Sequence, residues 1–442
     1  MKQPLVTIVG RPNVGKSTFF NRVLKRRDAI VHDQPGVTRD RHYAQSDWNG
    51  KSFMLVDTGG YMPSSQEFFD IAIREQVEIA IEEADIILFM VDQTTGITVI
   101  DEEIAAKLQR SDIPVLLLVN KVDNEKDESE GYQFYNLGLG DPLFVSAMQS
   151  RGIGDMLDVL TEHIDTPPPE DEDDGIIKLA VIGKENVGKS SFVNTILGRD
   201  RVIVTDVPGT TRDPIDSPFK YQKRDYIIID TAGLKRRAKV KENVLFYSQL
   251  RTMRSIERSD VVIYFLDAVE GVTRQDMRII TEAVAARKPI VVAANKWDMI
   301  EEKDERTYHV RQNEIREKLG TFSFIPIMFT SVLEKQRLYK LMDLATEAYE
   351  RHKTEIKTSQ LNKILLPIIK QISPPASKGK EVKLNYITQL NAAPPVFGFF
   401  GNHPELIPEN YRRFLEKQIR AHWDFIGVPV TLVFKPKNKD PR

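Results

Sequence analysis

Short, uninterrupted apolar runs alternate with stretches of helical periodicity through the first 165 residues. Such runs are typical of strands in a parallel sheet that helices cover on both faces, because these strands have no polar side. The pattern predicts a doubly wound, mostly parallel α/β domain, in which ligands bind at the carboxyl ends of the strands. The predicted strands are 5–9, 53–56, 86–91 and 115–119, and the predicted helices between them include 67–83 and 101–110.

The same order of elements returns after residue 175. An apolar run at 176–182 opens the second copy, and the polar string that begins at Asp57 recurs at Asp230, 173 residues later. Residues 92–98 resemble residues 267–273 at an offset of 175. Because the period is this long, it indicates a duplicated domain and not a solenoid of short repeats.

A proline-rich acidic string separates the two copies. Residues 166–175 contain three adjacent prolines followed by five adjacent acids. Prolines stiffen such a segment and the acids keep it solvated, so we expect an extended linker. The chain is therefore predicted to contain a first α/β domain over 1–165, this linker, a second α/β domain over 176–352 and a third domain over 353–442.

The third domain leaves the repeated pattern. Its sequence predicts a small α+β fold in which an amphipathic helix packs its apolar face on a sheet and exposes a cationic stripe. We expect a helix at 359–371, strands at 382–388, 396–400 and 429–434, and a frayed tail at 435–442. On the last helix the apolar face comprises Tyr411, Phe414, Leu415 and Ile419, and the opposite face comprises Arg412, Arg413, Lys417 and Arg420.

Each α/β domain begins with a glycine-rich loop between its first strand and first helix. The loops fit the phosphate-loop pattern of Gly, four free positions, Gly-Lys and Ser or Thr, in the strand–loop–helix context that the motif needs. Their N–H groups and the helix N-terminus would face a phosphate, the lysine would add charge and the serine hydroxyl would bind Mg²⁺. The loops are Gly10-Arg11-Pro12-Asn13-Val14-Gly15-Lys16-Ser17 and Gly183-Lys184-Glu185-Asn186-Val187-Gly188-Lys189-Ser190.

A second pair of motifs follows an apolar strand in each copy. The aspartate can hold Mg²⁺ through water, and the glycine N–H can bond the γ-phosphate, so that the segment moves when this phosphate leaves. Thr38 and Thr211 lie in Gly/Pro loops after the first helix of each copy and fit a second hydroxyl ligand to Mg²⁺. The motifs are Asp57-Thr58-Gly59-Gly60 and Asp230-Thr231-Ala232-Gly233.

A third pair of motifs selects the base. Guanine presents donors at N1 and N2 that one carboxylate can accept together, whereas adenine presents no such pair. The asparagine suits the O6/N7 edge, and a later Ser-Ala or Ser-Val backbone N–H could reach O6. The motifs are Asn120-Lys121-Val122-Asp123 with Ser146-Ala147, and Asn295-Lys296-Trp297-Asp298 with Ser331-Val332.

Each motif alone has an alternative explanation as loop or turn chemistry. All three occur in order, twice, and together they predict two guanine-nucleotide sites. The seven histidines show no metal-ligand spacing, and the absence of cysteine excludes disulfides, thiolate zinc sites and cysteine nucleophiles. No apolar run reaches 18 residues, so we expect no membrane span.

Net charge is unevenly distributed along the chain. Residues 1–174 carry a balance of −16, residues 175–352 carry +6 and residues 353–442 carry +8. Such asymmetry is compatible with a polyanionic partner for the basic part, and also with solubility alone.

These motifs resemble those of the translation-factor-related class of GTPases. Two such domains followed by a basic C-terminal domain resemble the Der (EngA) family, whose members have two G domains. The resemblance covers essentially the whole chain. It implies a bacterial cytoplasmic GTPase that acts in maturation of the large ribosomal subunit, with GTP or GDP and Mg²⁺ as ligands and a K-homology-like domain from about residue 355. Nothing in the sequence suggests an obligate oligomer.

Hydrolysis of GTP by this chain requires a catalytic arrangement that differs from that of the template GTPases. There a glutamine just after the Asp-x-x-Gly motif orients the attacking water, but Tyr61 and Leu234 stand at these positions. Arg39 and Arg212 lie near the switch threonines, and surface charge explains them equally well. The resemblance implies a K⁺ ion held partly by Asn13 and Asn186; the alternative is that these asparagines only stabilise the turn.

Two departures from family patterns bear on the third domain and the base site. Gly398-Phe399-Phe400-Gly401 matches a Gly-x-x-Gly string, but it lies in or beside a strand, so we expect a packing or turn role and not an RNA clamp. Val332 replaces the usual alanine after Ser331, which a backbone contact tolerates.

Three functions compete. The first is a GTP-driven ribosome-assembly factor that binds ribosomal RNA or protein through its basic C-terminal region. The second is a GTPase switch for a protein or membrane partner, and the third is a phosphate-loop kinase. The +8 balance and the absence of an amphipathic anchor favour the first over the second. The base motif predicts guanine selectivity, but the sequence shows no site for a substrate that would accept a phosphoryl group, and this disfavours the kinase.

Overall fold

The computed structural model describes the chain as two compact units, which are treated separately here. The first unit is described up to residue 164 and the second from residue 175 onward. Most of the predicted linker, most of the predicted helix 67–83 and the last six residues lie outside the described part. The described residues are 4–24, 43–57, 77–78, 80–81, 84–164, 175–198, 203–204, 216–229, 251–301, 304–375 and 380–436.

The first unit is built on a six-stranded sheet in the order β2-β3-β1-β4-β5-β6. All neighbours are parallel except β2 and β3, which form an antiparallel pair. Its strands are β1 (Leu5–Val9), β2 (Tyr43–Trp48), β3 (Lys51–Asp57), β4 (Ile86–Asp92), β5 (Val115–Asn120) and β6 (Leu143–Phe144). Its helices are α1 (Lys16–Leu24), η3 (Gln93–Thr95), α3 (Val99–Leu108), α4 (Glu125–Gly131), η4 (Tyr132–Leu137) and α5 (Ile153–Glu162).

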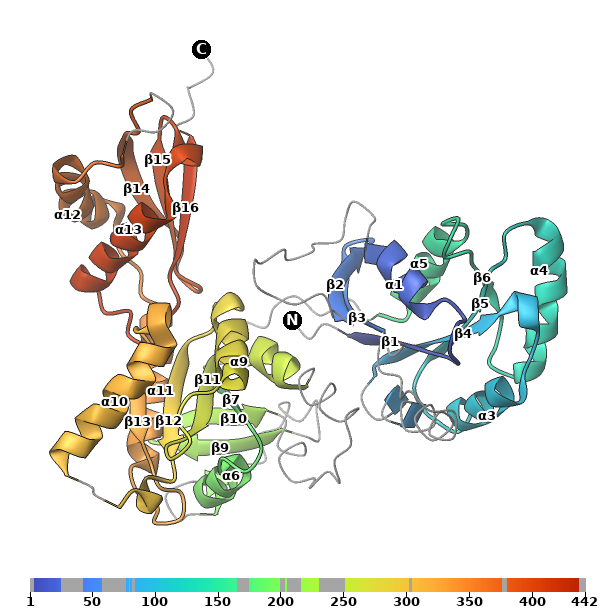
Figure 1. The fold of residues 1–442 in the computed structure, drawn as a ribbon, viewed down its shortest axis with the longest axis horizontal. Coiled ribbons are helices and arrows are strands. Elements are labelled where there is room, and N and C mark those ends of the chain that lie inside the picture. The colour runs from blue at the N-terminus through green and yellow to red at the C-terminus, as the bar shows by residue number, and fades with distance from the viewer. Residues whose placement is uncertain are drawn as a thin grey trace. The chain divides into compact units, whose positions relative to one another are not determined.

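Separate hydrophobic cores cover the two faces of this sheet. Helices α1 and α5 pack on one face and α3 with η4 on the other, as Figure 1 shows for α1, α5 and α3. Strand β1 contributes to both cores, because Val6 and Ile8 point to one face and Val9 to the other. This two-sided burial is the reason for the continuous apolar runs in the sequence and confirms the predicted fold class.

The second unit begins with a seven-stranded sheet in the order β13-β12-β11-β7-β10-β9-β8. Helices α6 and α11 pack on one face, and α9 and α10 on the other. Its strands are β7 (Ile177–Gly183), β8 (Ile203–Val204), β9 (Ser217–Tyr221), β10 (Arg224–Ile229), β11 (Val261–Asp267), β12 (Ile290–Asn295) and β13 (Ile327–Phe329). Its helices are α6 (Lys189–Leu197), α9 (Arg274–Ala285), η5 (Trp297–Met299), α10 (Glu305–Leu319), η6 (Gly320–Phe322) and α11 (Leu338–His352).

The same unit ends in the predicted small α+β fold. Strand β15 pairs antiparallel with β14 and parallel with β16, and helices α12 and α13 lie on one side of this sheet (Figure 1). The Gly398–Gly401 string lies within β15, as expected, and not between helices. The elements are α12 (Thr358–Gln371), β14 (Leu384–Asn391), β15 (Val396–Gly401), η7 (Pro404–Leu406), α13 (Glu409–His422) and β16 (Thr431–Pro436).

The predicted cationic stripe on α13 is wrong for two of its four residues. Arg420 is largely enclosed: its Nη1 donates to the carbonyl oxygens of Phe425 at 2.9 Å and Val428 at 3.0 Å. Its guanidinium carbon lies 4.1 Å from the centroid of the Phe324 ring. Arg412 donates to the carbonyl oxygen of Ile407 at 3.3 Å and is half-buried.

The reason for this error lies in the path of the chain after α13. The Gly427 N–H donates to the carbonyl oxygen of Phe324 at 2.9 Å, and the Gly427 carbonyl oxygen accepts from the Ile290 N–H at 2.8 Å. This segment encloses Arg420, whose guanidinium packs against the ring of Phe324. Arg413 and Lys417 remain exposed.

Arg420 is therefore expected to stabilise the junction between the second sheet and the third domain. Arg420→Ala leaves two carbonyl oxygens of buried residues without this donor, so we expect it to lower the free energy of unfolding by about 2–4 kcal/mol. Lys417→Ala, on the exposed side of the same helix, is the matched control and should change it by less than about 0.5 kcal/mol. Urea unfolding followed by circular dichroism measures both, and equal midpoints would contradict the assignment.

Candidate functional site

The two phosphate loops adopt matching backbone conformations. The φ angles of Asn13 and Gly15 are 64° and 100°, and those of Asn186 and Gly188 are 59° and 102°. Glycine is required at Gly15 because a Cβ there would lie 2.3 Å from the Nδ2 atom of Asn120. The asparagines occupy the left-handed region, which asparagine tolerates better than most residues. Their side chains are exposed, so a turn role and a cation-binding role are both sterically open.

The lysine of each phosphate loop is held by the loop itself. The Nζ atom of Lys16 donates to the carbonyl oxygens of Gly10 at 2.7 Å and Arg11 at 2.8 Å. Lys189 donates in the same way to Gly183 at 2.8 Å and to Lys184. Burial lowers the pKa of both lysines to about 8. A phosphate group would accept these N–H donors and favour the charged form.

One asparagine in each domain links the phosphate loop to the base motif. Asn120 donates from Nδ2 to the Val14 carbonyl oxygen at 2.7 Å and accepts at Oδ1 from the Ala147 N–H at 3.0 Å. Asn295 makes the equivalent bonds to Val187 at 2.8 Å and Val332 at 3.0 Å. The sequence predicted a contact with the base for these residues; the structure adds a bracing role.

The lysine of the base motif is fixed by an aspartate at the end of the neighbouring strand. Lys121 contacts Asp92 at 2.5 Å, and Lys296 contacts Asp267 at 2.7 Å. Burial acts to raise the pKa of Asp92, but the Lys121 ammonium and Thr94 together hold it below its usual value. The sequence shows that residues 92–98 recur at 267–273, but it contains no signal for this role of Asp92 and Asp267.

The carboxylate predicted to bind guanine in the first domain has a serine partner. Asp123 accepts at Oδ1 from the Ser146 hydroxyl at 2.6 Å, which fixes its rotation. The hydroxyls of Ser146 and Ser331 both accept from the backbone N–H three residues later, from Gln149 at 3.1 Å and from Glu334 at 3.0 Å. The middle residues Val122 and Trp297 are buried packing residues, and Trp297 lies 4.3 Å from Phe329 between ring centroids.

The Ser-Ala loop is also fixed by a contact that no sequence motif predicts. Arg22 on α1 donates to the carbonyl oxygens of Ala147 at 3.0 Å and Met148 at 2.6 Å. Thr195 stands at the equivalent position of the second domain, so this link belongs to the first. No motif signals Arg22, because its partners lie more than a hundred residues away.

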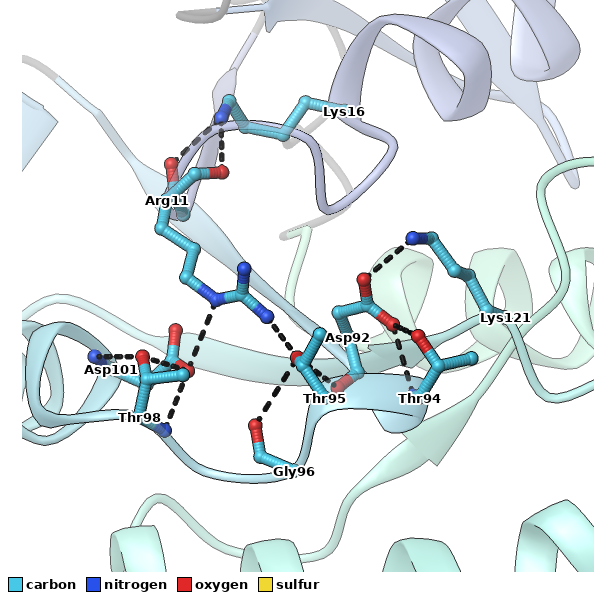
Figure 2. Close-up of polar contacts among 10 residues, drawn as sticks. Arg11, Lys16, Asp92, Thr94, Thr95, Gly96, Thr98, Asp101 and Lys121 are labelled. Carbon is cyan, nitrogen blue, oxygen red and sulfur yellow. Dashed lines mark hydrogen bonds and ion pairs between the residues drawn. The ribbon is translucent and has the colours of Figure 1, made fainter.

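The cation attached to each phosphate loop reaches the next helix along the sheet. Figure 2 shows Arg11 pointing toward Thr95 and Asp101, and its Nε atom lies 3.3 Å from the Asp101 carboxylate. In the second domain, Lys184 lies 3.3 Å from Asp276 and 2.7 Å from Glu270. The first free residue of each loop therefore ties the loop to the start of α3 or α9.

Mg²⁺ is implied by the motifs, and the described residues fit it in part. Asp57 ends β3, opposite Ile8 at the end of β1, and its carboxylate is close enough to act on the pKa of Lys16. Ser17 follows Lys16 on α1, and its side chain is exposed. Both supply the hard oxygen atoms that Mg²⁺ prefers, and Mg²⁺ usually takes only one or two ligands from a protein besides phosphate and water.

Several predicted site residues lie outside the described residues, and their roles remain predictions. Ser190 and the loop residues Pro12, Glu185 and Val187 are described and lie in the phosphate loops or directly after them. The predicted site residues outside the described part of the chain are Thr38, Thr58, Gly59, Gly60, Tyr61, Thr211, Asp230, Thr231, Ala232, Gly233 and Leu234.

No helix in the described part of the chain is long and apolar enough to cross a membrane.

Comparison with known proteins covers nearly the whole chain. Residues 5–121 and 178–296 match a family described as 50S ribosome-binding GTPase, and residues 355–435 match the C-terminal KH-domain-like family of EngA bacterial GTPase enzymes. GTPase Der of Chloroherpeton thalassium is 50% identical over 98% of this chain and 100% of its own length. GTPase Der of Flavobacterium johnsoniae is 47% identical over 99% and 100%.

Solved structures give a weaker match. The crystal structure of an Era variant from Aquifex aeolicus bound to GDP and AlF4⁻ has a TM-score of 0.31 at 23% identity, covering 60% of this chain and 93% of that one. A score this low carries no argument about this chain.

The low lysine pKa values predict proton uptake when a nucleotide binds. At pH 8 about half of Lys16 and Lys189 is neutral, and a bound phosphate should restore the charged form, so each site should take up roughly half a proton. Near pH 6.5 this uptake should vanish, and affinity should fall as the pH rises above 8. Titration calorimetry with GDP in buffers of different ionisation enthalpy measures the uptake.

Lys16→Arg and Lys189→Arg provide the control, because arginine does not titrate in this range. The proton uptake of the altered site should disappear while that of the other site remains. Zero uptake at pH 8 in the parent protein would contradict the lowered pKa.

Proposed function

The chain belongs to the Der family of GTPases, and from this premise we propose that it is an assembly factor of the large (50S) ribosomal subunit. As a member of that family it binds guanine nucleotide and hydrolyses GTP. The observation that supports the proposal is the combination of two G domains, each from a family described as 50S ribosome-binding, with a basic third domain.

Each G domain uses its phosphate loop and base motif for one GTP. Lys16 and Lys189 exchange their carbonyl partners for phosphate oxygens, while Asp123 and Asp298 accept from guanine N1 and N2. Asn120 and Asn295 keep the phosphate loop at a fixed distance from the Ser-Ala or Ser-Val backbone. Mg²⁺, when bound to Ser17, Asp57 and Thr38 or to Ser190, Asp230 and Thr211, supplies positive charge to the phosphates.

The switch segments carry the nucleotide state to the rest of the protein. Gly60 and Gly233 are proposed to bond the γ-phosphate through their N–H groups, and to release it after hydrolysis. Tyr61 and Leu234 cannot orient water as a glutamine does, so stabilisation of transition-state charge is the main catalytic route. We propose that K⁺, held partly by Asn13 and Asn186, supplies that charge.

The basic surface proposed to bind ribosomal RNA differs from the sequence-based stripe. Arg420 and Arg412 bond to backbone carbonyl oxygens, so the exposed cations within the two helices are Arg413 and Lys417 on α13 and Lys363 and Lys370 on α12. Both helices lie on the same side of the small sheet (Figure 1). Contacts of this kind bind phosphates and RNA shape and do not read bases. A protein or membrane partner without nucleic acid is the less favoured alternative, because it gives no role to the net charge of +8 in residues 353–442.

The K⁺ proposal predicts that GTP turnover is faster in KCl than in NaCl at matched ionic strength. Asn13→Gly and Asn186→Gly should remove this difference, because glycine keeps the left-handed turn while the amide oxygen is lost. Alanine would confuse the two roles by straining the turn. Steady-state phosphate release measures turnover; equal rates in both salts for the parent protein would refute K⁺ stimulation, and stimulation retained in the glycine variants would exclude the asparagines.

The RNA proposal predicts that Arg413→Glu with Lys417→Glu weakens co-sedimentation with large ribosomal subunits roughly tenfold or more, and flattens its salt dependence. Arg306→Glu with Arg316→Glu on α10 changes the net charge equally at exposed positions of the second G domain and is the matched control. Circular dichroism and GDP binding should be unchanged in both. If the α13 variant sediments like the parent, α13 is not the docking surface.

A further inference from the structure

The tie between each phosphate loop and its neighbouring helix is built from different residues in the two G domains. In the first domain it consists of Arg11, Thr95 and Asp101, and Phe89 lies on strand β4, next to β1 in the sheet. At the equivalent positions the second domain has Lys184, Glu270, Asp276 and Tyr264. The strand register confirms the equivalence of Phe89 and Tyr264, since Val9 pairs with Phe89 as Ile182 pairs with Tyr264.

The aspartate at the centre of each tie has no exposed surface and performs two tasks. Oδ2 of Asp101 accepts from the Thr98 N–H at 3.1 Å and the Thr98 hydroxyl at 2.7 Å, which caps α3, and it also faces Arg11. Asp276 caps α9 with Thr273 and faces Lys184. The phosphate loop is therefore tied to a group that the helix N-terminus already holds in place.

The two aspartates differ at their second oxygen atom. Oδ1 of Asp276 accepts from the Tyr264 hydroxyl at 2.7 Å, whereas Oδ1 of Asp101 is buried and has no hydrogen-bond partner among the described residues. Phe89 offers no donor, although its side chain is equally buried at 0% exposure. A buried carboxylate oxygen without a donor is costly, so the first tie is the less completely satisfied.

The cation that faces the aspartate also differs between the two domains. The Arg11 guanidinium can reach Asp101 and the Thr95 hydroxyl at once, because its donors form a planar fork. The Lys184 ammonium is a point charge, and Glu270 provides it with a second carboxylate. Burial acts to lower the pKa of Lys184, but Glu270 and Asp276 hold it above its usual value.

Each tie also acts on the lysine that contacts phosphate. The carbonyl oxygen of Arg11 accepts from Lys16, and that of Lys184 accepts from Lys189, so the tied residue is also a partner of the phosphate-binding lysine. Holding the loop in one shape reduces the ordering cost that a nucleotide must meet when it binds.

We propose that Arg11–Asp101 and Lys184–Asp276 are positioning pairs for the phosphate loops, and that the Tyr264 hydroxyl makes the second pair stiffer and slows release of nucleotide from the second site. This inference rests on the proposed role of the two loops as nucleotide sites. It makes Tyr264 a determinant of how long the second domain keeps its nucleotide.

A reciprocal exchange of one hydroxyl group tests the proposal in the full-length protein. Phe89→Tyr should slow release of fluorescent GDP from the first site roughly fivefold, and Tyr264→Phe should speed release from the second site by a similar factor. Release from the first site is measured in an Asp298→Asn background, and release from the second site in an Asp123→Asn background, so that the other site binds GDP weakly. Stopped-flow dissociation against excess unlabelled GDP gives the rates.

Two further variants separate positioning from simple stabilisation. Ile104→Val and Ile279→Val remove one methylene at matching buried positions of α3 and α9, and should lower stability without changing release. In an Arg11→Met background, Phe89→Tyr should no longer slow release, because the hydroxyl acts on the loop only through Asp101 and Arg11.

The outcomes distinguish this inference from the proposed function. If neither site binds GDP in the parent protein, the proposed function is wrong and the inference falls with it. If both sites bind GDP but the hydroxyl exchange leaves the release rates unchanged, only the inference is overturned. It is also overturned if release follows stability equally in the hydroxyl variants and in the valine controls.

Discussion

Both nucleotide sites depend on one buried asparagine that holds two loops together. Asn120 and Asn295 each bond the carbonyl oxygen of a phosphate-loop residue and the N–H of the residue after the loop serine. These loops are more than a hundred residues apart in the sequence, and this amide bonds to both of them. The glycine before the lysine is required for the same reason, since any side chain there would collide with the amide. The proposed phosphate site and the proposed base site are therefore held at a fixed separation by the protein itself.

Much of the fold and most of the candidate site could be predicted from the sequence because their signals are local. Buried parallel strands appear as unbroken apolar runs, and each motif keeps its chemistry within eight residues. Arg420 shows where this reasoning fails. Its position on α13 is predictable from periodicity, but its burial depends on how residues 424–428 return to the second sheet. A helix pattern contains no information about which other segment covers its polar face.

The ties between phosphate loop and helix show a second limit. Asp101 has the sequence features of a helix-capping residue, and that function is present. Nothing in its local sequence indicates that Arg11, ninety positions earlier, uses the same carboxylate. Dual use of this kind can be detected only when distant strands are placed side by side. The comparison of two copies within one chain then shows which parts vary together, because Arg, Thr and Phe in one copy are replaced by Lys, Glu and Tyr in the other.

Duplication allowed the two sites to diverge around a constant frame. The asparagine brace and the lysine–aspartate pair are the same in both domains, since any change there would alter the distance from base to phosphate. The residues that differ include Arg22, which bonds the Ser-Ala loop of the first domain, and Phe89, which is replaced by Tyr264 in the second domain. In the proposed scheme such changes would alter the lifetime of a bound nucleotide without changing which base is selected.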